Sequence, residues 1–413
     1  MTYNLIFYVI IAILVIDFAL ERFLEYLNRK RMTSDLPQEL KDVFDAEQYK
    51  KQQAYKKTND RFGTLTSSFS FIILLLMLFL GGFKLVDSWA RGVTENPVFI
   101  VLVFFGILAI ASDLITTPFS LYDIFVIEER FGFNRTTPKT YVLDKIKGWL
   151  LGAVIGGGLL ALIVWFYSKT GTDFWIYAWI LAVVFTVFMA MFYSSLIVPL
   201  FNKQKPLPDG ELRDAIQAFS VKAGFKLNNI FVIDGSKRSS KANAYFTGLG
   251  PKKRIVLYDT LIKDLTTEEI VAVLAHEIGH YKKHHVYAGL LAGIIQTGFT
   301  LYILSLLIAN PALSEALGGS QPAFHLGLIA FGILYSPISL VTGLLMNHIS
   351  RRNEYAADNF VKMNSNPEAL VNALKKLSSK NLSNLTPHPA YVFFHYSHPT
   401  LLQRVKALKS KAD

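Results

Sequence analysis

The residues His276-Glu277-Ile278-Gly279-His280 have the types and spacing of a metal-dependent peptidase site. Two histidines four residues apart lie one above the other on a helix, so both imidazoles can reach one metal ion. The glutamate between them is close enough to handle the proton of a water molecule that the metal activates. Because the chain has no cysteine, a zinc site must use histidine and carboxylate ligands, and disulfides are excluded.

This chemistry requires a helix, and the surrounding residues predict one. Thr266 followed three residues later by Glu269 is typical of a capping box at a helix start. Apolar residues then recur with helical spacing, at Ile270, Val271, Leu274 and Ile278. We expect the motif to lie inside this helix, and the helix to continue through residues 281–285 into a membrane span.

A catalytic zinc site needs three protein ligands and one open position. A third histidine ten residues after the first is absent, since Val286 occupies that position. The best candidate is Glu354, because Asp358 four residues later shares its helix face: one carboxylate could bind zinc while the other accepts the second N–H of a ligand histidine. The alternative is an exposed helix in which Arg351 or Arg352 pairs with a carboxylate, and the upstream motif favours the metal.

The elements that position these residues include membrane spans. Hydrophobic residues make up 52% of the 413 residues, and the mean hydropathy is +0.34. They collect in runs near the roughly 20 residues that cross a bilayer. We predict seven spans at 3–26, 65–86, 97–118, 148–168, 175–200, 285–309 and 323–347. The expected protein is mainly α-helical, with a five-span membrane region at 1–200 and a peptidase region at 201–413 that includes the last two spans.

The chain has a net charge of +11, and its basic residues are unevenly divided among the loops between the predicted spans. Lysine and arginine gather in the loops at about 28–63 and 130–147 and are sparse in the alternate loops. This positive-inside pattern predicts an N-terminus outside the membrane, with the C-terminus and the active site in the cytoplasm. No basic patch with interleaved aromatic residues occurs, so nucleic-acid binding is not expected.

The polar segments predict a small α+β unit beside the motif helix. Residues 210–222 have helical spacing, and 229–233, 243–246 and 253–258 have the composition of strands. In the C-terminal tail we expect helices near 351–363 and 367–379 and an irregular stretch at 386–400.

The chain resembles the Ste24-type CaaX prenyl proteases of the M48 metallopeptidase family over nearly its whole length. The matching segments are Tyr49–Tyr55, Ile127–Asn134, Val198–Lys203, Ser239–Gly248, the His276–His280 motif, the Glu354/Asp358 pair and Ser397–Pro399. The resemblance implies seven spans around a large water-filled chamber, with a gluzincin-like zinc domain at its cytoplasmic side. The shorter HtpX-type proteases lack the five-span region and fit less well.

The resemblance also implies roles for the metal site. His276, His280 and Glu354 are expected to hold one Zn²⁺ per chain. Glu277 is expected to act as the general base that takes the proton of water and later delivers it to the leaving amine. Asp358 is expected to hold a ligand histidine in place.

Outside the metal site, Asn243 and Ala244 resemble the edge strand on which such enzymes lay the substrate backbone; the alternative is a plain strand end. His398 resembles a histidine that stabilises the oxyanion; the alternative is an ordinary surface histidine. Arg404 is expected to anchor that segment to a carboxylate that the sequence does not identify. We expect His284 and His285 at the membrane interface rather than in the site.

The predicted function is therefore that of a membrane-embedded zinc endopeptidase of the CaaX prenyl protease type, which cuts near the C-terminus of a peptide or protein substrate. That substrate is either prenylated at a C-terminal CaaX or unprenylated, and membrane lipid is the other partner. Alternatives are a membrane-protein quality-control protease with the same chemistry and a non-catalytic scaffold, although the intact motif residues disfavour the scaffold. The expected location is the bacterial inner membrane, or the endoplasmic reticulum membrane of a eukaryote.

Overall fold

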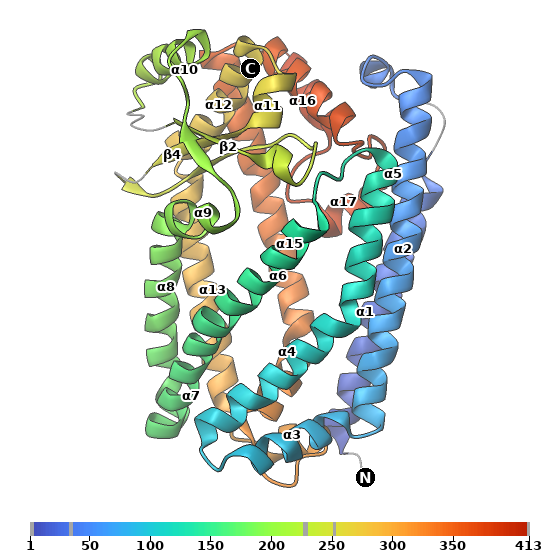
Figure 1. Ribbon diagram of the computed structural model, residues 1–413, viewed down its shortest axis with the longest axis vertical. Helices are drawn as coiled ribbons and strands as arrows, with labels where there is room; N and C mark the ends of the chain where they lie inside the picture. The colour runs from blue at the N-terminus through green and yellow to red at the C-terminus, as the bar shows by residue number, and fades with distance from the viewer. Residues whose placement is uncertain (1–3, 33–35, 226–229, 251–252, 411–413) are drawn as a thin grey trace.

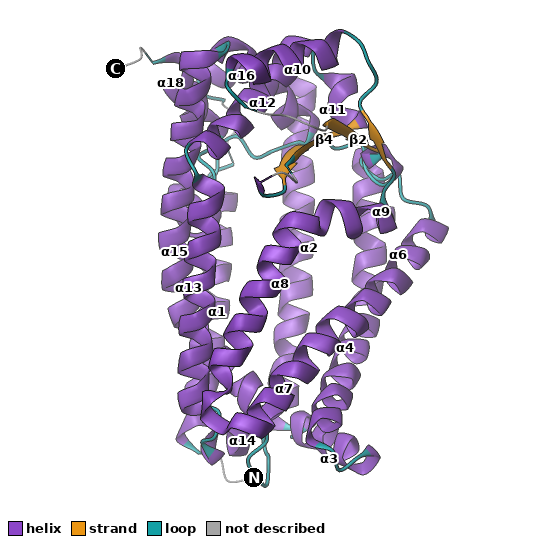
Figure 2. Cartoon of the chain, turned by 90° about the vertical axis from the view of Figure 1, so that its left-hand side faces the viewer, coloured by secondary structure: helices purple, strands orange, loops and turns teal. Residues whose placement is uncertain are grey.

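Long helices stand side by side in this protein, and a small sheet with shorter helices covers one end of them (Figures 1 and 2). The computed structural model describes residues 4–32, 36–225, 230–250 and 253–410. Residues 3 and 229, at the starts of a predicted span and a predicted strand, lie outside these ranges. The expectation of a mainly helical membrane protein with a small sheet is confirmed.

The secondary-structure elements of the N-terminal region are all helices within the described residues. Its long helices are α1 (Leu5–Lys30), α2 (Ala46–Phe79), α4 (Pro97–Tyr122), α6 (Pro138–Leu151), α7 (Gly158–Thr170) and α8 (Phe174–Leu196). Its shorter elements are η1 (Gln38–Leu40), α3 (Gly82–Val93), η2 (Asp123–Glu128), α5 (Glu129–Phe131), η3 (Gly152–Gly157), η4 (Gly171–Asp173) and α9 (Val198–Phe201). Two of these, η2 and η3, are π-helical turns inside longer helices.

Five helical stretches of the described chain are long and apolar enough to cross a membrane. They are Ala46–Phe79, Pro97–Phe131, Pro138–Phe201, His285–Leu307 and Phe324–Asn364. The stretch at Pro138–Phe201 contains two of the predicted spans, while α1 coincides with the first predicted span but is not among the five. The count of seven therefore stays a prediction.

The sheet consists of β1 (Gln204–Pro206), β2 (Ile230–Ile233), β3 (Ala244–Thr247) and β4 (Arg254–Tyr258), in the order β1-β2-β4-β3. Strand β2 runs parallel to β4, and the two outer strands are antiparallel to their neighbours. Strand β4 lies between β2 and β3, and its residues Ile255, Val256 and Leu257 are fully buried. The predicted strands are thus confirmed, and β3 lies at an edge.

The remaining helices are α10 (Glu211–Lys222), η5 (Gly235–Lys237), α11 (Asp259–Asp264), α12 (Thr267–Lys282), α13 (His285–Leu307), α14 (Pro311–Ala316), α15 (Phe324–Asn364), α16 (Pro367–Lys380), α17 (Pro389–His395) and α18 (Leu401–Lys409). Helix α12 packs against α15 and α16, so the two helices that carry the candidate ligands are neighbours.

Three local predictions are wrong. The motif helix does not continue into the next span, because α12 ends at Lys282 and α13 begins at His285. The last span and the first tail helix are one helix of 41 residues, since the polar residues 351–354 interrupt its hydrophobicity but not its hydrogen bonding. The stretch at 386–400 contains α17, which begins with Pro389 at a position where proline suits a helix start.

Candidate active site and metal centre

The start of α12 is fixed by reciprocal hydrogen bonds. The Thr266 hydroxyl accepts from the backbone N–H of Glu269 at 3.3 Å, and the Glu269 carboxylate accepts from the backbone N–H of Thr266 at 2.8 Å. The predicted capping box is therefore confirmed. Ile270, Leu274 and Ile278 are buried on one face of the helix. Cap and apolar face together fix the direction in which the motif side chains point.

Three side chains from α12 and α15 converge on one point. His276 Nε2 and His280 Nε2 lie 3.2 Å apart, and they lie 3.3 and 3.2 Å from the two carboxylate oxygens of Glu354. Ligand atoms held about 2.0–2.1 Å from a tetrahedral ion are roughly 3.3 Å from one another. Glu354 Oε2 is buried and has no hydrogen-bond partner among the described residues. The donor set and its spacing therefore fit one metal ion.

A second carboxylate supports His276 from behind. Asp358 Oδ1 lies 2.9 Å from His276 Nδ1, the ring nitrogen that faces away from Glu354. The same carboxylate accepts two hydrogen bonds from Arg404 of α18, at 2.9 Å from Nε and 2.6 Å from Nη2. Asp358 is thus the carboxylate that anchors Arg404, which the sequence did not identify.

At His276 and Arg404, burial and the neighbouring carboxylates shift the pKa in opposite directions. Burial by itself lowers the pKa of His276, but hydrogen bonds to Asp358 and Glu354 outweigh it, and the pKa lies above its ordinary value. Burial likewise disfavours the charge of Arg404, yet Asp358 and Glu354 keep its pKa raised. Arg404 is therefore a permanent positive charge beside two carboxylates.

A cavity of about 690 Å³ opens onto the three converging side chains. Glu277 and His398 line it together with the start of α13 and residues 346–354 of α15. His398 Nε2 lies 3.2 Å from Glu354 Oε1, and its side chain is 61% exposed, so the ring is accessible from the cavity. The structure thus places Glu277, predicted as the base, and His398, predicted as an oxyanion donor, at the same cavity as the ligands.

Asn243 and Ala244 line this cavity too. The backbone carbonyl of Asn243 accepts from the N–H of Tyr258 on β4, and β3 has no strand on its other side among the described residues. The two residues therefore lie at the free edge of the sheet, next to the histidines of α12.

The chain matches two family models in succession. Residues 25–203 match CAAX prenyl protease N-terminal, five membrane helices, and residues 206–412 match Peptidase family M48. CAAX prenyl protease 1 of Saccharomyces cerevisiae is 35% identical, over 95% of this chain and 93% of that protein. CAAX prenyl protease 1 homolog of Homo sapiens is 31% identical, over 94% and 92%. The crystal structure of S. mikatae Ste24p has a TM-score of 0.93 at 34% identity, over 99% of this chain and 100% of that one.

The chain belongs to peptidase family M48. It is a membrane-embedded metalloprotease of the CaaX prenyl protease type, as expected from its motifs. The family implies a metal, and the M48 site described above has a matching group of side chains.

The position of His285 at the membrane interface stays a prediction, since His285 is the first residue of a candidate span. The structure adds a contact that the sequence did not indicate, because its Nδ1 lies 3.1 Å from Nδ1 of His280 at the M48 site. The break between α12 and α13 turns His285 back toward the ligands. No glycine or proline marks this break in the sequence.

Three of the segments that carry the M48 resemblance meet at one lysine. Lys241 Nζ lies 2.8 Å from Glu128 of η2 and 2.9 Å from the hydroxyl of Tyr55 on α2, and it stands over the ring of Phe133 at 4.4 Å. Lys241 precedes Asn243 by two residues. These contacts tie the start of the edge strand to the membrane region.

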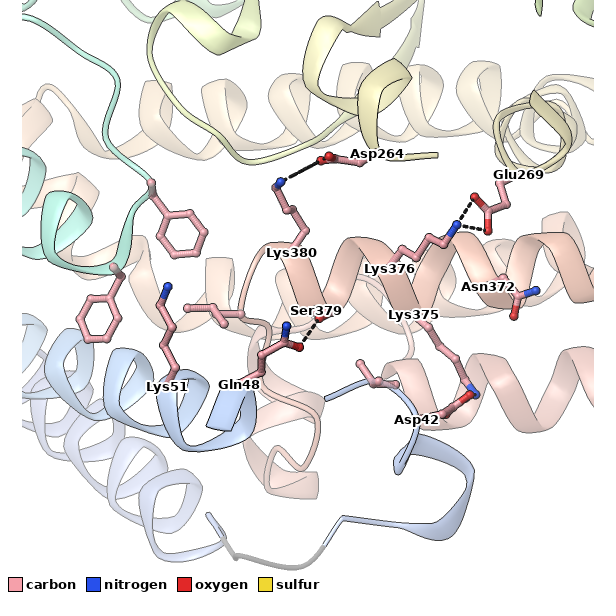
Figure 3. Close-up of a pocket in the computed structure, with 14 residues that line it drawn as sticks. Asp42, Gln48, Lys51, Asp264, Glu269, Asn372, Lys375, Lys376, Ser379 and Lys380 are labelled. Carbon is pink, nitrogen blue, oxygen red and sulfur yellow. Dashed lines mark hydrogen bonds and ion pairs between the residues drawn. The ribbon is translucent and has the colours of Figure 1, made fainter. Parts of the chain in front are cut away.

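A second cavity, of about 650 Å³, lies beside the start of α12 and is lined by α2 and α16 (Figure 3). Three lysines of α16 line it, and each pairs with a carboxylate: Lys375 with Asp42 at 2.7 Å, Lys376 with Glu269 at 2.7 Å and Lys380 with Asp264 at 3.2 Å. Because the Glu269 carboxylate also belongs to the capping box of α12, its ion pair with Lys376 ties α16 to the start of the motif helix.

Proposed function

We propose that this M48 protease hydrolyses peptide bonds near the C-terminus of its substrates with one zinc ion held by His276, His280 and Glu354. The observation that carries the proposal is the convergence of these three ligand atoms within 4.8 Å of one another at the wall of a cavity. Two imidazoles and one carboxylate, with an open fourth position, are a donor set of catalytic zinc. When bound, zinc supplies a Lewis acid toward a carbonyl oxygen and makes water more acidic.

The chain's own residues then perform the proton transfers. Glu277, on the cavity wall, takes the proton of the attacking water and delivers it to the leaving amine. Asp358 accepts the N–H at Nδ1 of His276 and so leaves Nε2 free to bind the metal. His398 donates a hydrogen bond to the oxyanion that develops on the scissile carbonyl.

The substrate backbone binds to the free edge at Asn243 and Ala244. An extended peptide can add to an exposed strand edge through main-chain hydrogen bonds, and this edge runs along the cavity that contains the histidines. The names of the relatives, CAAX prenyl protease 1 and its homologs, support a substrate that is prenylated at a C-terminal CaaX.

The proposed orientation puts the sheet and the metal site on the cytoplasmic side of the membrane. The basic residues of the loops at 28–63 and 130–147 support it, since such residues stay on the cytoplasmic side. We also propose a boundary near residue 200 between the membrane region and the peptidase region, which lies close to the change from one family match to the other.

The test compares E277Q with E268Q in the full-length protein reconstituted with zinc. Both glutamates lie on α12, but Glu268 is exposed and bonds to Asn366 away from the cavity. We expect E277Q to retain one zinc per chain and lose cleavage of a farnesylated CaaX peptide, while E268Q retains both. Normal turnover by E277Q would remove Glu277 from the mechanism. Cleavage of unprenylated peptides alone would favour the quality-control function.

A further inference from the structure

The chain changes direction between the motif helix and the next helix at a residue with an unusual backbone. His284 has φ 57° and ψ 21°, in the left-handed region that side chains other than glycine rarely adopt. The backbone N–H of His284 closes α12 on Tyr281, and its carbonyl accepts the N–H of Ala288 in the first turn of α13. Strained backbone of this kind persists where the surrounding structure requires it.

The result of this turn is that His285 faces back onto His280. The two rings meet edge to face, with centroids 5.1 Å apart and planes at 72°. Their Nδ1 atoms are 3.1 Å apart, which is a hydrogen-bond distance. His285 also lines the cavity of the metal site.

The other ring nitrogen of His280, Nε2, points to the candidate ligands His276 and Glu354. Its Nε2 lies 3.2 Å from Glu354 and 3.2 Å from Nε2 of His276. A neutral imidazole has one N–H, so a histidine that binds metal through Nε2 carries its proton on Nδ1. That N–H of His280 points at Nδ1 of His285, which must then be the acceptor and carry its own proton on Nε2.

The two ligand histidines are therefore supported in parallel ways. His276 has the carboxylate of Asp358 at its Nδ1, and His280 has the imidazole of His285 at its Nδ1. Outer partners of this kind fix the tautomer and the rotation of a ligand ring. We propose that His285 is a positioning residue for the metal site, and that the left-handed turn at His284 places it there. This inference rests on the proposed zinc chemistry of the same site.

The test is the zinc affinity of the full-length wild type and three variants, measured by competition with a chromophoric chelator. H285F keeps a ring of similar size but has no acceptor, and we expect about 10–100-fold weaker zinc binding. H285N restores an acceptor near the position of Nδ1, and we expect it to recover most of the affinity. H284N is the matched control, because asparagine tolerates the left-handed region and the ring of His284 packs near Tyr287 rather than in the wall of the cavity.

The visible spectrum of cobalt-substituted protein gives a second readout, since it reports the geometry of the ligands directly. We expect H285F to change this spectrum and H284N to leave it as in the wild type. If H285F does not fold, H285A removes the acceptor with less bulk and is compared in the same way. Equal zinc affinity and an equal cobalt spectrum in H285F and wild type would overturn the role of His285. Failure of the wild type to bind zinc would instead overturn the proposed function.

Discussion

Adding one methyl group at Gly279 tests whether the spacing of α12 and α15 controls the metal site. A Cβ at this position would lie 3.1 Å from Cβ of Phe360, 3.2 Å from Cα of Ala357 and 3.3 Å from the carbonyl oxygen of Ala357. Ordinary contacts begin at about 3.4 Å. Two of the three atoms belong to the backbone and cannot rotate away. In G279A the two helices must therefore move apart by a few tenths of an ångström.

The free-energy terms of G279A oppose each other. Alanine favours a helix over glycine by about 1 kcal/mol, while overpacking a close contact costs about 1–3 kcal/mol. The net loss of stability is thus only about 0–2 kcal/mol. The ligand set is more sensitive, because Glu354 lies three residues from Ala357 on α15 while both histidines lie on α12. Such sites need their groups held within about 0.5 Å. A shift of a few tenths of an ångström uses most of that margin, so we expect zinc binding to weaken, by roughly tenfold.

The assay is zinc affinity by chelator competition together with thermal unfolding of the metal-free protein in detergent. The matched control is G63A in α2, where an added Cβ has no neighbour within 4 Å. We expect G63A to bind zinc as the wild type does and to unfold at the same or a higher temperature. Wild-type zinc affinity in G279A would show that the helices can separate without opening the ligand set, and the reasoning would be wrong.

Three further predictions concern groups around the site. D358N should weaken zinc binding about 10–100-fold and lower the unfolding free energy by about 3 kcal/mol, because Arg404 keeps a buried charge without its main partner; chelator competition and thermal unfolding measure both. E128Q removes the charge that holds Lys241. The lost ion pair is worth about 1 kcal/mol of substrate binding, so we expect KM to rise about fivefold with kcat nearly unchanged. For Glu269, burial raises the pKa, but the hydrogen bonds from Lys376 and from Thr266 together with the charge of Lys376 outweigh it, so the pKa lies below its ordinary value of 4.5. Stability from this carboxylate is present above pH 4.5 and is lost as the pH falls through the lowered pKa, and unfolding of E269Q should depend less on pH in that range.

Local signals in the sequence predict the elements that carry the chemistry. The capping box at Thr266 and the buried stripe of α12 are short-range features, and both have the expected geometry. The strands around β4 follow from β-branched residues between turns. The break at His284 leaves no such signal, because a histidine adopts the left-handed conformation that glycine or asparagine usually marks.

The candidate site shows the same division between local and long-range information. Spacing on one helix pairs His276 with His280 and pairs Glu354 with Asp358. It does not say which carboxylate faces the metal, since that depends on the crossing of α12 and α15. Arg404 comes from α18, 46 residues beyond Asp358, and its partner follows only from tertiary packing. The same holds for His285, whose direction depends on one backbone angle.

The buried charges explain why Arg404 belongs to this site. Glu354 and Asp358 are buried carboxylates, and Glu277 lines the same cavity as Glu354. Such a group is costly when it lacks compensating positive charge. Arg404 offsets one of them through two hydrogen bonds to Asp358. Two carboxylates then remain for one divalent cation, so the set is neutral with the metal that its geometry fits. Arg404 therefore keeps Asp358 ionised as an acceptor for His276, and Glu354 remains available as a ligand.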